Sequence, residues 1–252
     1  MKKEAILWTA CMRPEYAKVS LESIFSAIDD DIDFYAFVDN SGDNRSLEIV
    51  NILKQYPAFI THRERNYSPA ENFLDAAESL YVSGYETFHE IEEDIIISKN
   101  FFKKGREILS NPDITLFFGT LINDENRNNI TETGFLPWGI SYKKSFYEYM
   151  RPYVNPFLES RTIGIDTTKS FLLESFKNES ISAIGPDGLM HRVMQKYKLK
   201  GQWGDRSYAK DIGAYGKHRL KGKIPIKTLQ EWADTPPTNQ PGYGIQGIDF
   251  IL

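Results

Sequence analysis

Three consecutive acidic residues carry the most specific chemical signal in this sequence. Glu92, Glu93 and Asp94 end an apolar segment and are followed at once by the apolar run 95–97. Carboxylates this close repel one another, and a hard divalent cation such as Mn²⁺ or Mg²⁺ removes that repulsion and also binds diphosphates. A turn that is acidic only because it is solvated is the competing interpretation, and it stays open for a bare triplet of acids.

A second candidate is the aspartate of the turn Gly185–Gly188. Asp187 precedes an amphipathic helical pattern that includes Leu189 and Val193, so we expect it at a helix N-terminus. The helix dipole favours an ionised carboxylate there, and such a carboxylate can take the proton of an attacking hydroxyl group. Simple capping of the helix is the alternative role for this residue.

The elements that must position these residues alternate between strand and helix in the first half of the chain. The third expected helix of the first half starts at Pro69, with Ser68 as its N-cap residue and Glu71 completing a capping box. Strands that alternate with helices predict an α/β fold with a mostly parallel sheet covered on both faces, where ligands bind at the carboxyl ends of the strands. The expected strands are 5–10, 33–39, 58–62 and 86–94, and the expected helices are 16–25, 46–56 and the one from residue 69.

The second half of the sequence is less regular. We expect strands at 114–122, 138–142 and 201–203, a polar loop at 123–133, and helices at 145–150 and 166–176. An amphipathic helix that includes Leu189, Val193 and Met194 is expected after Gly188. The last thirty residues hold four of the 12 prolines, which is typical of an extended tail or lid. The predicted organisation is one domain, residues 1–223, with halves 1–102 and 103–223, followed by a tail at 224–252.

Length and composition restrict the class of protein. The 252 residues suit one domain, and 41% hydrophobic and 26% charged residues are ordinary for a soluble globular protein. Cys11 is the only cysteine, which indicates a reducing compartment or an inert buried thiol, and we expect a cytoplasmic protein. No apolar run is long enough to predict a transmembrane segment. The net charge of -5 argues against strong nonspecific binding to duplex nucleic acid.

Four segments in continuous order, within residues 4–102, resemble the GT-A glycosyltransferases of the family-2-like group. The segments are WTACMRPEYAKVSLESI, FVDNSGDN, RERNYSPAENFLDAAE and EIEEDIIISKNFF. The resemblance implies a GT-A, Rossmann-like fold with a mixed, mostly parallel sheet flanked by helices, and a nucleotide-sugar-dependent glycosyltransferase. The chain departs from the family at Glu92 and Glu93, where Asp is usual.

The resemblance also implies roles for individual residues in the first half. Asp94 would ligate the metal, and Glu92 would approach the ribose. Capping of the first helix is the alternative role for Thr9 and Arg13, and a turn-forming role is the alternative for Asp39. The residues implied to bind the nucleotide or the donor sugar are Thr9, Arg13, Glu15, Asp39, Asn72, Glu92 and Glu93.

Three segments of the second half extend the resemblance. GPDGLMHRVMQKYKLKG is similar to the segment that carries the general base, Asp187, although Pro186 replaces the usual Glu. DIGAYGKH is similar to the element in which a histidine, here His218, completes the metal site. FLPWGISYKKSFYEYM is similar to the stretch that walls the sugar and acceptor site, which implies Trp138 and Gly139; a core role is the alternative for Trp138. The other histidines lack such a context, and we interpret them as structural: His62, His89 and His191.

The sequence therefore predicts a glycosyltransferase that uses Mn²⁺ or Mg²⁺ to move a sugar, with inversion, from a nucleotide-diphosphate sugar to an acceptor hydroxyl. A UDP-sugar is the expected donor, and a carbohydrate or, less favoured, a modified DNA base the expected acceptor. A nucleotidyltransferase is disfavoured because the turn 10–15 has no glycine, and the sequence has no P-loop motif. A non-catalytic module that binds a sugar or nucleotide stays open, and the sequence does not set the oligomeric state.

Overall fold

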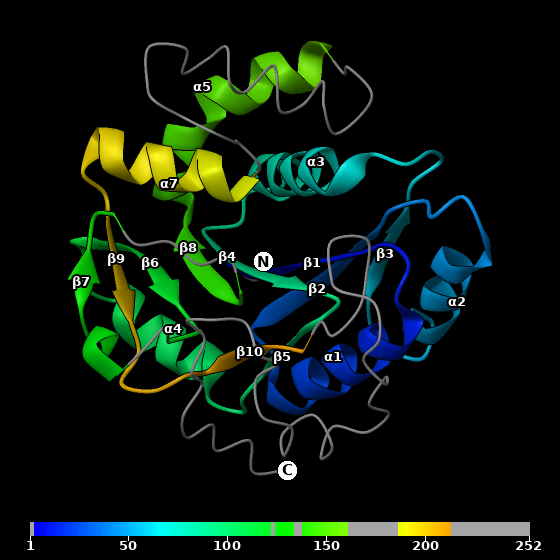
Figure 1. The fold of residues 1–252 in the computed structure, drawn as a ribbon, viewed down its shortest axis with the longest axis horizontal. Coiled ribbons are helices and arrows are strands. Elements are labelled where there is room, and N and C mark those ends of the chain that lie inside the picture. The colour runs from blue at the N-terminus through cyan, green and yellow to red at the C-terminus, as the bar shows by residue number, and fades with distance from the viewer. Residues whose placement is uncertain (1–2, 122–123, 134–137, 161–185, 213–252) are drawn as a thin grey trace.

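The computed structural model describes residues 3–121, 124–133, 138–160 and 186–212, and their main element is one large mixed sheet (Figure 1). The sheet has eight strands in the order β3-β2-β1-β4-β8-β6-β9-β7. The predicted α/β fold class is confirmed.

The first half of the chain forms the parallel part of this sheet. Strand β1 (Glu4–Ala10) lies between β2 (Ile32–Val38) and β4 (Thr87–Glu92), and β3 (Phe59–His62) pairs with the far side of β2. All three pairings are parallel, as the alternation of strands and helices predicted. The connecting helices are α1 (Pro14–Ala27), α2 (Asn44–Leu53) and α3 (Ser68–Val82).

The second half adds strands of both directions. Strand β8 (Ile140–Lys143) runs antiparallel between β4 and β6 (Ile114–Phe118), and β9 (Lys200–Trp203) runs parallel to β6. The edge strand β7 (Ile130–Thr131) follows a short 3₁₀ helix in the expected polar loop. A separate antiparallel pair joins β5 (Ile95–Ile97) to β10 (Ala209–Asp211), and the sequence did not predict this pair.

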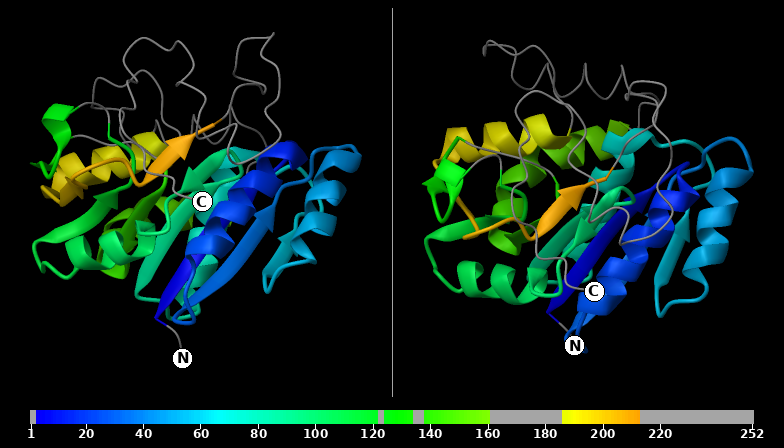
Figure 2. Two further views of the ribbon diagram at one scale, coloured as in Figure 1. Left: turned by 90° about the horizontal axis from the view of Figure 1, so that it is seen from below. Right: turned by 60° about the horizontal axis from the view of Figure 1, so that its bottom comes forward.

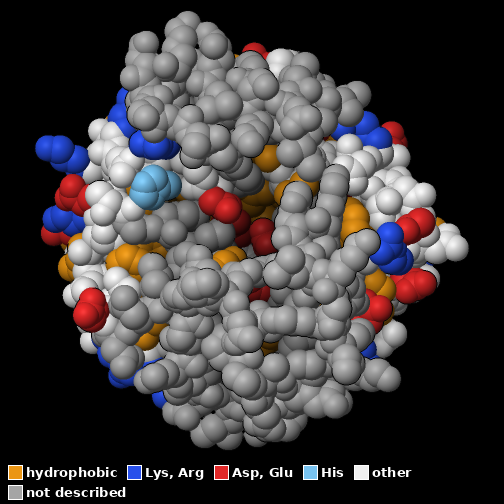
Figure 3. Space-filling model, viewed as in Figure 1, with side chains coloured by type: hydrophobic (Ala, Val, Ile, Leu, Met, Phe, Trp, Pro, Cys, Tyr) orange, Lys and Arg blue, Asp and Glu red, His pale blue; other side chains and the backbone are white. Residues whose placement is uncertain are grey.

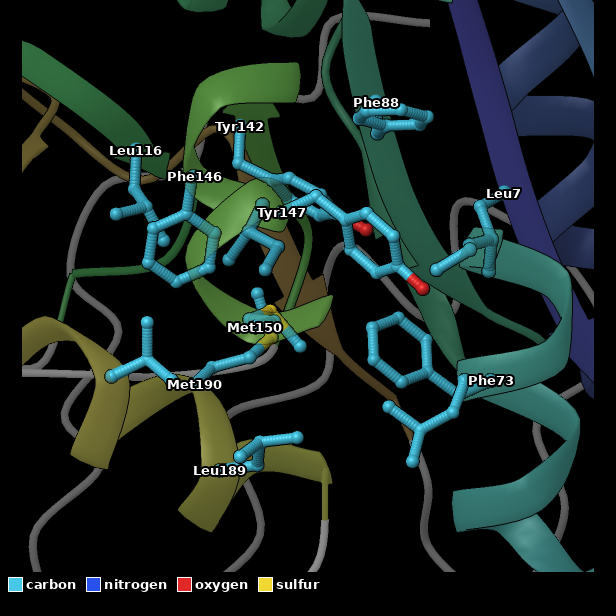
Figure 4. Packing of buried hydrophobic residues seen from close by; sticks show 14 of the residues in the cluster. Leu7, Phe73, Phe88, Leu116, Tyr142, Phe146, Tyr147, Met150, Leu189 and Met190 are labelled. Atoms are coloured by element: carbon cyan, nitrogen blue, oxygen red, sulfur yellow. The ribbon is translucent and has the colours of Figure 1, made fainter. Parts of the chain in front are cut away.

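Helices cover both faces of the sheet and create two apolar layers. Helices α3, α5 (Lys144–Ser160) and α7 (Pro186–Tyr197) cover one face, and α1, α2 and α4 (Phe101–Leu109) lie against the other (Figures 1 and 2). Side chains of a strand alternate between faces, so β1 sends Leu7 to the first layer and Trp8 to the second. Figure 4 shows Tyr147 of α5 lying between Phe88 of β4 and Phe73 of α3 in this layer.

The start of α3 differs from the predicted capping box. Tyr67 is the N-cap residue, no side chain caps the helix, and Ser68 has a positive φ of 68°. Glu71 pairs with Arg65 instead, at 2.5 and 3.1 Å, because Arg65 offers a charged partner to both carboxylate oxygens. The expected capping by Ser68 and Glu71 is therefore wrong.

Other elements also end at residues that differ from the predicted ones. Helix α5 continues to Ser160 through Pro152 and Pro156, well beyond the expected residue 150, and the strand expected to reach residue 122 ends at Phe118. The helix expected at 166–176 and the tail at 224–252 lie outside the described residues. Within the described ranges, no helix is long and apolar enough to cross a membrane.

Candidate functional site

The acidic turn follows the carboxyl end of β4, beside the end of β1. Thr9 pairs with Glu92 across the two strands, and the backbone N–H of Glu93 donates to the carbonyl of Thr9 at 2.9 Å. The parallel register therefore places the predicted donor-binding residues Thr9, Glu92 and Glu93 together at the edge of the sheet where ligands bind in open α/β folds.

Arg13 holds two of the three acids. Its Nε donates to Glu93 Oε1 at 3.0 Å, and its Nη1 donates to Asp94 Oδ2 at 2.6 Å. The other oxygen of Asp94, Oδ1, is buried and has no hydrogen-bond partner among the described residues. Arg13 is the N-cap residue of α1, but its side chain makes no capping hydrogen bond. The side chain instead forms ion pairs with Glu93 and Asp94.

The pair β5–β10 fixes the backbone around Asp94. The N–H of Ile212 donates to the carbonyl of Asp94 at 2.8 Å, and the N–H of Ser98 donates to the carbonyl of Tyr208 at 2.9 Å. These bonds tie the acidic turn to a segment more than 100 residues later, directly before the sequence predicted to contain His218. His218 itself lies outside the described residues.

Glycine allows the predicted sugar-site segment to approach β10. Gly139 has a φ of 67°, and a Cβ on this residue would lie 2.4 Å from the Cβ of Ala209. Thr120 Oγ1 bonds the carbonyls of both Trp138 and Ala209, at 2.8 and 2.9 Å. The half-buried Trp138 packs against the layer that contains α1 and α4. The structure thus places Trp138 and Gly139 beside β10, while their sugar-binding role stays a prediction.

Asn72 joins α3 to β2. Its Nδ2 donates to the carbonyl of Phe37 at 3.0 Å, and its Oδ1 accepts from Arg63 Nε at 2.8 Å. Arg63 also pairs with Asp75 at 2.6 Å and lies over the rings of Phe37 and Tyr67. This buried arginine was missed by sequence reasoning, because no local pattern shows which of the several arginines near α3 turns inward.

Asp39 closes the end of β2 onto the start of α3. The buried Oδ1 accepts from the backbone N–H groups of Asn40 at 2.9 Å and Tyr67 at 2.7 Å. Burial raises the pKa of Asp39 although these hydrogen bonds act in the opposite direction. The half-buried Cys11 is nearby, and burial with the charges of Asp39 and Glu93 raises its pKa to about 12, which makes it an unreactive thiol. Glu15 is exposed in the first turn of α1.

Asp187 lies in the first turn of α7, as predicted, and belongs to the same electrostatic neighbourhood as the acidic turn. Burial raises the pKa of Glu92 well above its usual range, and the charges of Asp94, Asp187 and Glu93 add to this effect. Asp187 is exposed to solvent, yet the surrounding protein removes enough water to raise its own pKa. Figure 3 shows acidic side chains in a hollow near the centre of this face. The charges of Glu92 and Asp187, which are 95 positions apart in the sequence, therefore act on each other.

The site offers one carboxylate oxygen as a possible ligand for a cation. Asp94 Oδ1 has no partner in the described part of the chain, and oxygen is the ligand type that Mn²⁺ and Mg²⁺ prefer. Within the described ranges, no three His, Cys, Asp or Glu side chains are arranged to hold a metal ion. Asp94 therefore fits as one ligand, and further ligands would come from a bound diphosphate, from water or from outside those ranges.

The other predicted histidines are placed within the fold. His89 is fully buried and bonds Ser141 at 2.7 Å and Glu4 at 3.1 Å, and burial lowers its pKa. His62 lies 3.3 Å from Ser46 Oγ, and His191 is half-buried on α7. His62 and His89 thus lie in contacts that join elements of the fold.

Comparison with known proteins gives matches in structure alone. No protein-family model and no curated protein matches this sequence. The structure of S. aureus TarS residues 1–349 with UDP-GlcNAc aligns with a TM-score of 0.57 and 13% identity, over 91% of this chain and 64% of that one. A longer TarS structure aligns with a TM-score of 0.58 and 12% identity, over 82% of this chain and 36% of that one.

A mannosyltransferase from Pyrobaculum calidifontis, in complex with GDP-Man and Mn²⁺, aligns over 58% of this chain and 46% of its own, with 10% identity. Its TM-score of 0.47 carries no conclusion about this chain. The chain spans less than two thirds of the length of all three structures. At these identities the likeness to TarS shows the fold alone, and together with the mixed sheet described above it gives this chain a GT-A-like fold.

Proposed function

We propose that this protein is a metal-dependent glycosyltransferase that moves a sugar from a UDP-sugar to an acceptor hydroxyl with inversion. The observation that carries the proposal is the acidic turn at the carboxyl end of β4, where the buried Oδ1 of Asp94 has no hydrogen-bond partner among the described residues. Asp187 at the start of α7 acts on the same turn through its charge. TarS, whose fold this chain shares, has been crystallised with UDP-GlcNAc, which supports a UDP-sugar as donor.

The donor side of the proposed site is the edge formed by β1, β2 and β4. Asp94 Oδ1 would hold Mn²⁺ or Mg²⁺, and the bound ion would neutralise charge on the departing diphosphate. His218 is proposed as a further ligand; it follows Ile212 by six residues, and Ile212 bonds the backbone of Asp94, so the chain is long enough to return to the site. The residues proposed to contact the nucleotide or donor sugar are Thr9, Arg13, Glu15, Asp39, Asn72, Glu92 and Glu93.

The acceptor side is formed by the start of α7. Asp187 would take the proton of the acceptor hydroxyl as that oxygen attacks the anomeric carbon from the face opposite the leaving group. The N-terminal dipole of α7 favours the ionised base, while burial raises its pKa toward the value at which a base works well near neutral pH. Trp138 and Gly139 are proposed to wall the sugar. A carbohydrate is the proposed acceptor, with a modified DNA base as the alternative.

A turnover experiment tests the proposal. Release of nucleoside diphosphate from a panel of UDP- and GDP-sugars would be measured with Mn²⁺ and with a chelator, for the natural protein, Asp94→Asn, Asp187→Asn and the matched control Asp113→Asn. Asp113 is exposed and distant in sequence from the acidic turn. We expect the chelator to abolish turnover and Asp187→Asn to reduce it by about 10²-fold or more, as for loss of a general base. Nucleotide binding without turnover would instead establish a non-catalytic module. Turnover that survives both the chelator and the substitution Asp187→Asn would refute the proposed site.

A further inference from the structure

Arg13 lies against the carboxylate that is proposed to hold the cation. Its Nη1 donates to Asp94 Oδ2 at 2.6 Å, and its Nε donates to Glu93 Oε1 at 3.0 Å. The second oxygen of the same carboxylate, Asp94 Oδ1, is buried and has no hydrogen-bond partner among the described residues. Asp94 therefore binds a guanidinium through one oxygen and offers only the other oxygen to a divalent ion.

A divalent ion on Asp94 Oδ1 would lie close to the guanidinium of Arg13. An oxygen ligand lies about 2.1 Å from Mg²⁺, and the two oxygens belong to one carboxylate, so the ion would lie within about 7 Å of Nη1. The side chains of Arg13 and Asp94 are only 16% and 7% exposed, so solvent screens the repulsion between the two positive charges weakly. The charge of Arg13 therefore opposes an ion that arrives alone.

Arg13 does not easily leave this position. Glu93 and Asp94 both accept hydrogen bonds from it, and its guanidinium carbon lies 5.6 Å from the centre of the Tyr16 ring. Withdrawal of the guanidinium would leave two buried carboxylates without their cation, which is strongly unfavourable. A divalent ion that arrives alone would therefore bind against the charge of Arg13 and would not displace it.

A diphosphate would offset this repulsion. Its oxygens carry negative charge, and both a divalent ion and a guanidinium bind such oxygens. We propose that Arg13 weakens the binding of a divalent ion alone, so that the site takes up the ion together with a diphosphate. This inference rests on the proposed function and adds a role for Arg13, because its charge makes the site selective for the complex of ion and nucleotide over the free ion.

Binding of Mn²⁺ without nucleotide tests this role and needs no turnover. Free Mn²⁺ would be measured by electron paramagnetic resonance for the natural protein, Arg13→Met, Arg13→Lys and the control Arg45→Met, whose exposed arginine pairs with Asp43. We expect Arg13→Met to bind Mn²⁺ about tenfold more tightly or more, because a positive charge within about 7 Å of the ion has been removed. Arg13→Lys, which keeps the charge, and Arg45→Met should bind Mn²⁺ as the natural protein does. Asp94→Asn, added to Arg13→Met, should abolish the gain.

Saturating UDP provides the second comparison. UDP should tighten the binding of Mn²⁺ to the natural protein by a larger factor than its binding to Arg13→Met, and an equal factor would overturn the inference. Binding of free Mn²⁺ by Arg13→Met that is no tighter than that of the natural protein would show that Arg13 does not oppose the ion. A gain in Arg13→Lys as large as that in Arg13→Met would show that the charge of Arg13 is not responsible. Each of these results would refute the inference.

The same measurements separate this inference from folding and from the proposed function. If Arg13→Met does not fold, Arg13→Gln takes its place, because glutamine removes the charge but keeps an N–H donor for the acids. The expected Mn²⁺ binding without turnover of any donor sugar would refute the proposed function alone. Turnover of a donor sugar without the gain in Mn²⁺ binding would refute this inference alone.

Discussion

Replacing Arg13 by methionine should destabilise the protein more than the loss of any surface ion pair. Methionine keeps an apolar contact next to Tyr16 but leaves Glu93 and Asp94 without the cation that now lies 3.0 and 2.6 Å from them. The three side chains are only 16%, 8% and 7% exposed, so solvent screens the pairs weakly. Removal of one partner from such a buried pair costs about 3–5 kcal/mol, and we expect about 3 kcal/mol because Arg13 keeps some exposure.

The loss should depend on pH, with a sign that the structure fixes. The pKa of Glu93 is raised by burial, and Arg13 opposes this rise. Without Arg13 the pKa of Glu93 in the folded state rises further, while its value in the unfolded state stays near 4.5. A group whose folded pKa is raised stabilises the protein below the unfolded pKa, and this contribution is lost as pH rises through the folded pKa. The deficit of Arg13→Met should therefore be smallest near pH 5 and largest at pH 8.

Urea denaturation at pH 5, 6, 7 and 8, with a chelator present, measures this deficit. Arg45→Met is the matched control: Arg45 also pairs with an aspartate, Asp43, but both side chains are about half exposed, at 51% and 45%. We expect the control to lose far less stability than Arg13→Met at every pH, because solvent screens an exposed ion pair. A deficit of Arg13→Met no larger than that of the control, or one that does not grow with pH, would refute the reasoning.

Two further substitutions test contacts that hold the site together. Arg63→Met should cost about 3–5 kcal/mol in urea unfolding, because it removes the cation that pairs with the half-buried Asp75 and a donor to Asn72. Arg63→Lys, which keeps the charge but not the planar guanidinium, should lose less. Gly139→Ala should cost about 2–4 kcal/mol, because the new Cβ meets Ala209 at 2.4 Å and φ is positive, and should weaken binding of Mn²⁺·UDP in calorimetry. Gly42→Ala shares the positive φ but meets nothing within 4 Å, so it should cost only about 1 kcal/mol and leave binding unchanged. Equal losses for the two glycine variants would contradict the role given to the approach of β10.

The parallel half of the fold could be predicted because its signals are local. Each strand of this half is a short apolar run, and each helix follows it within a few residues. Because the strands are parallel, the carboxyl ends of β1, β2 and β4 lie at one edge of the sheet. The pattern therefore predicts that Thr9, Asp39 and Glu92 lie near one another. The position of Asp187 at a helix start was also readable, since an aspartate before an amphipathic run indicates an N-terminus.

The remaining features depend on contacts between distant residues. Nothing near Ile95–Ile97 or Ala209–Asp211 indicates that these short segments pair, because three residues carry too little periodicity to specify a partner. The ion pairs of Arg13 join positions about 80 residues apart. Helix α5 continues beyond the predicted residue 150 although Pro152 and Pro156 each remove a backbone donor. The buried face through Val154 and Phe157 continues past them, and tertiary packing decides the outcome.

The balance of charge in the site constrains how a donor would bind there. Glu93 and Asp94 share the guanidinium of Arg13, and Glu92 and Asp187 add two further acids. A diphosphate that approached alone would meet these carboxylates at close range in a partly buried site, where repulsion is screened less than in water. A divalent ion held by Asp94 Oδ1 would reverse the sign of this interaction for the phosphate oxygens and for the acids. The acidic turn is therefore unfavourable for a bare nucleotide and favourable for a nucleotide that arrives with its cation, so in the proposed enzyme the cation and the diphosphate bind as one cooperative unit.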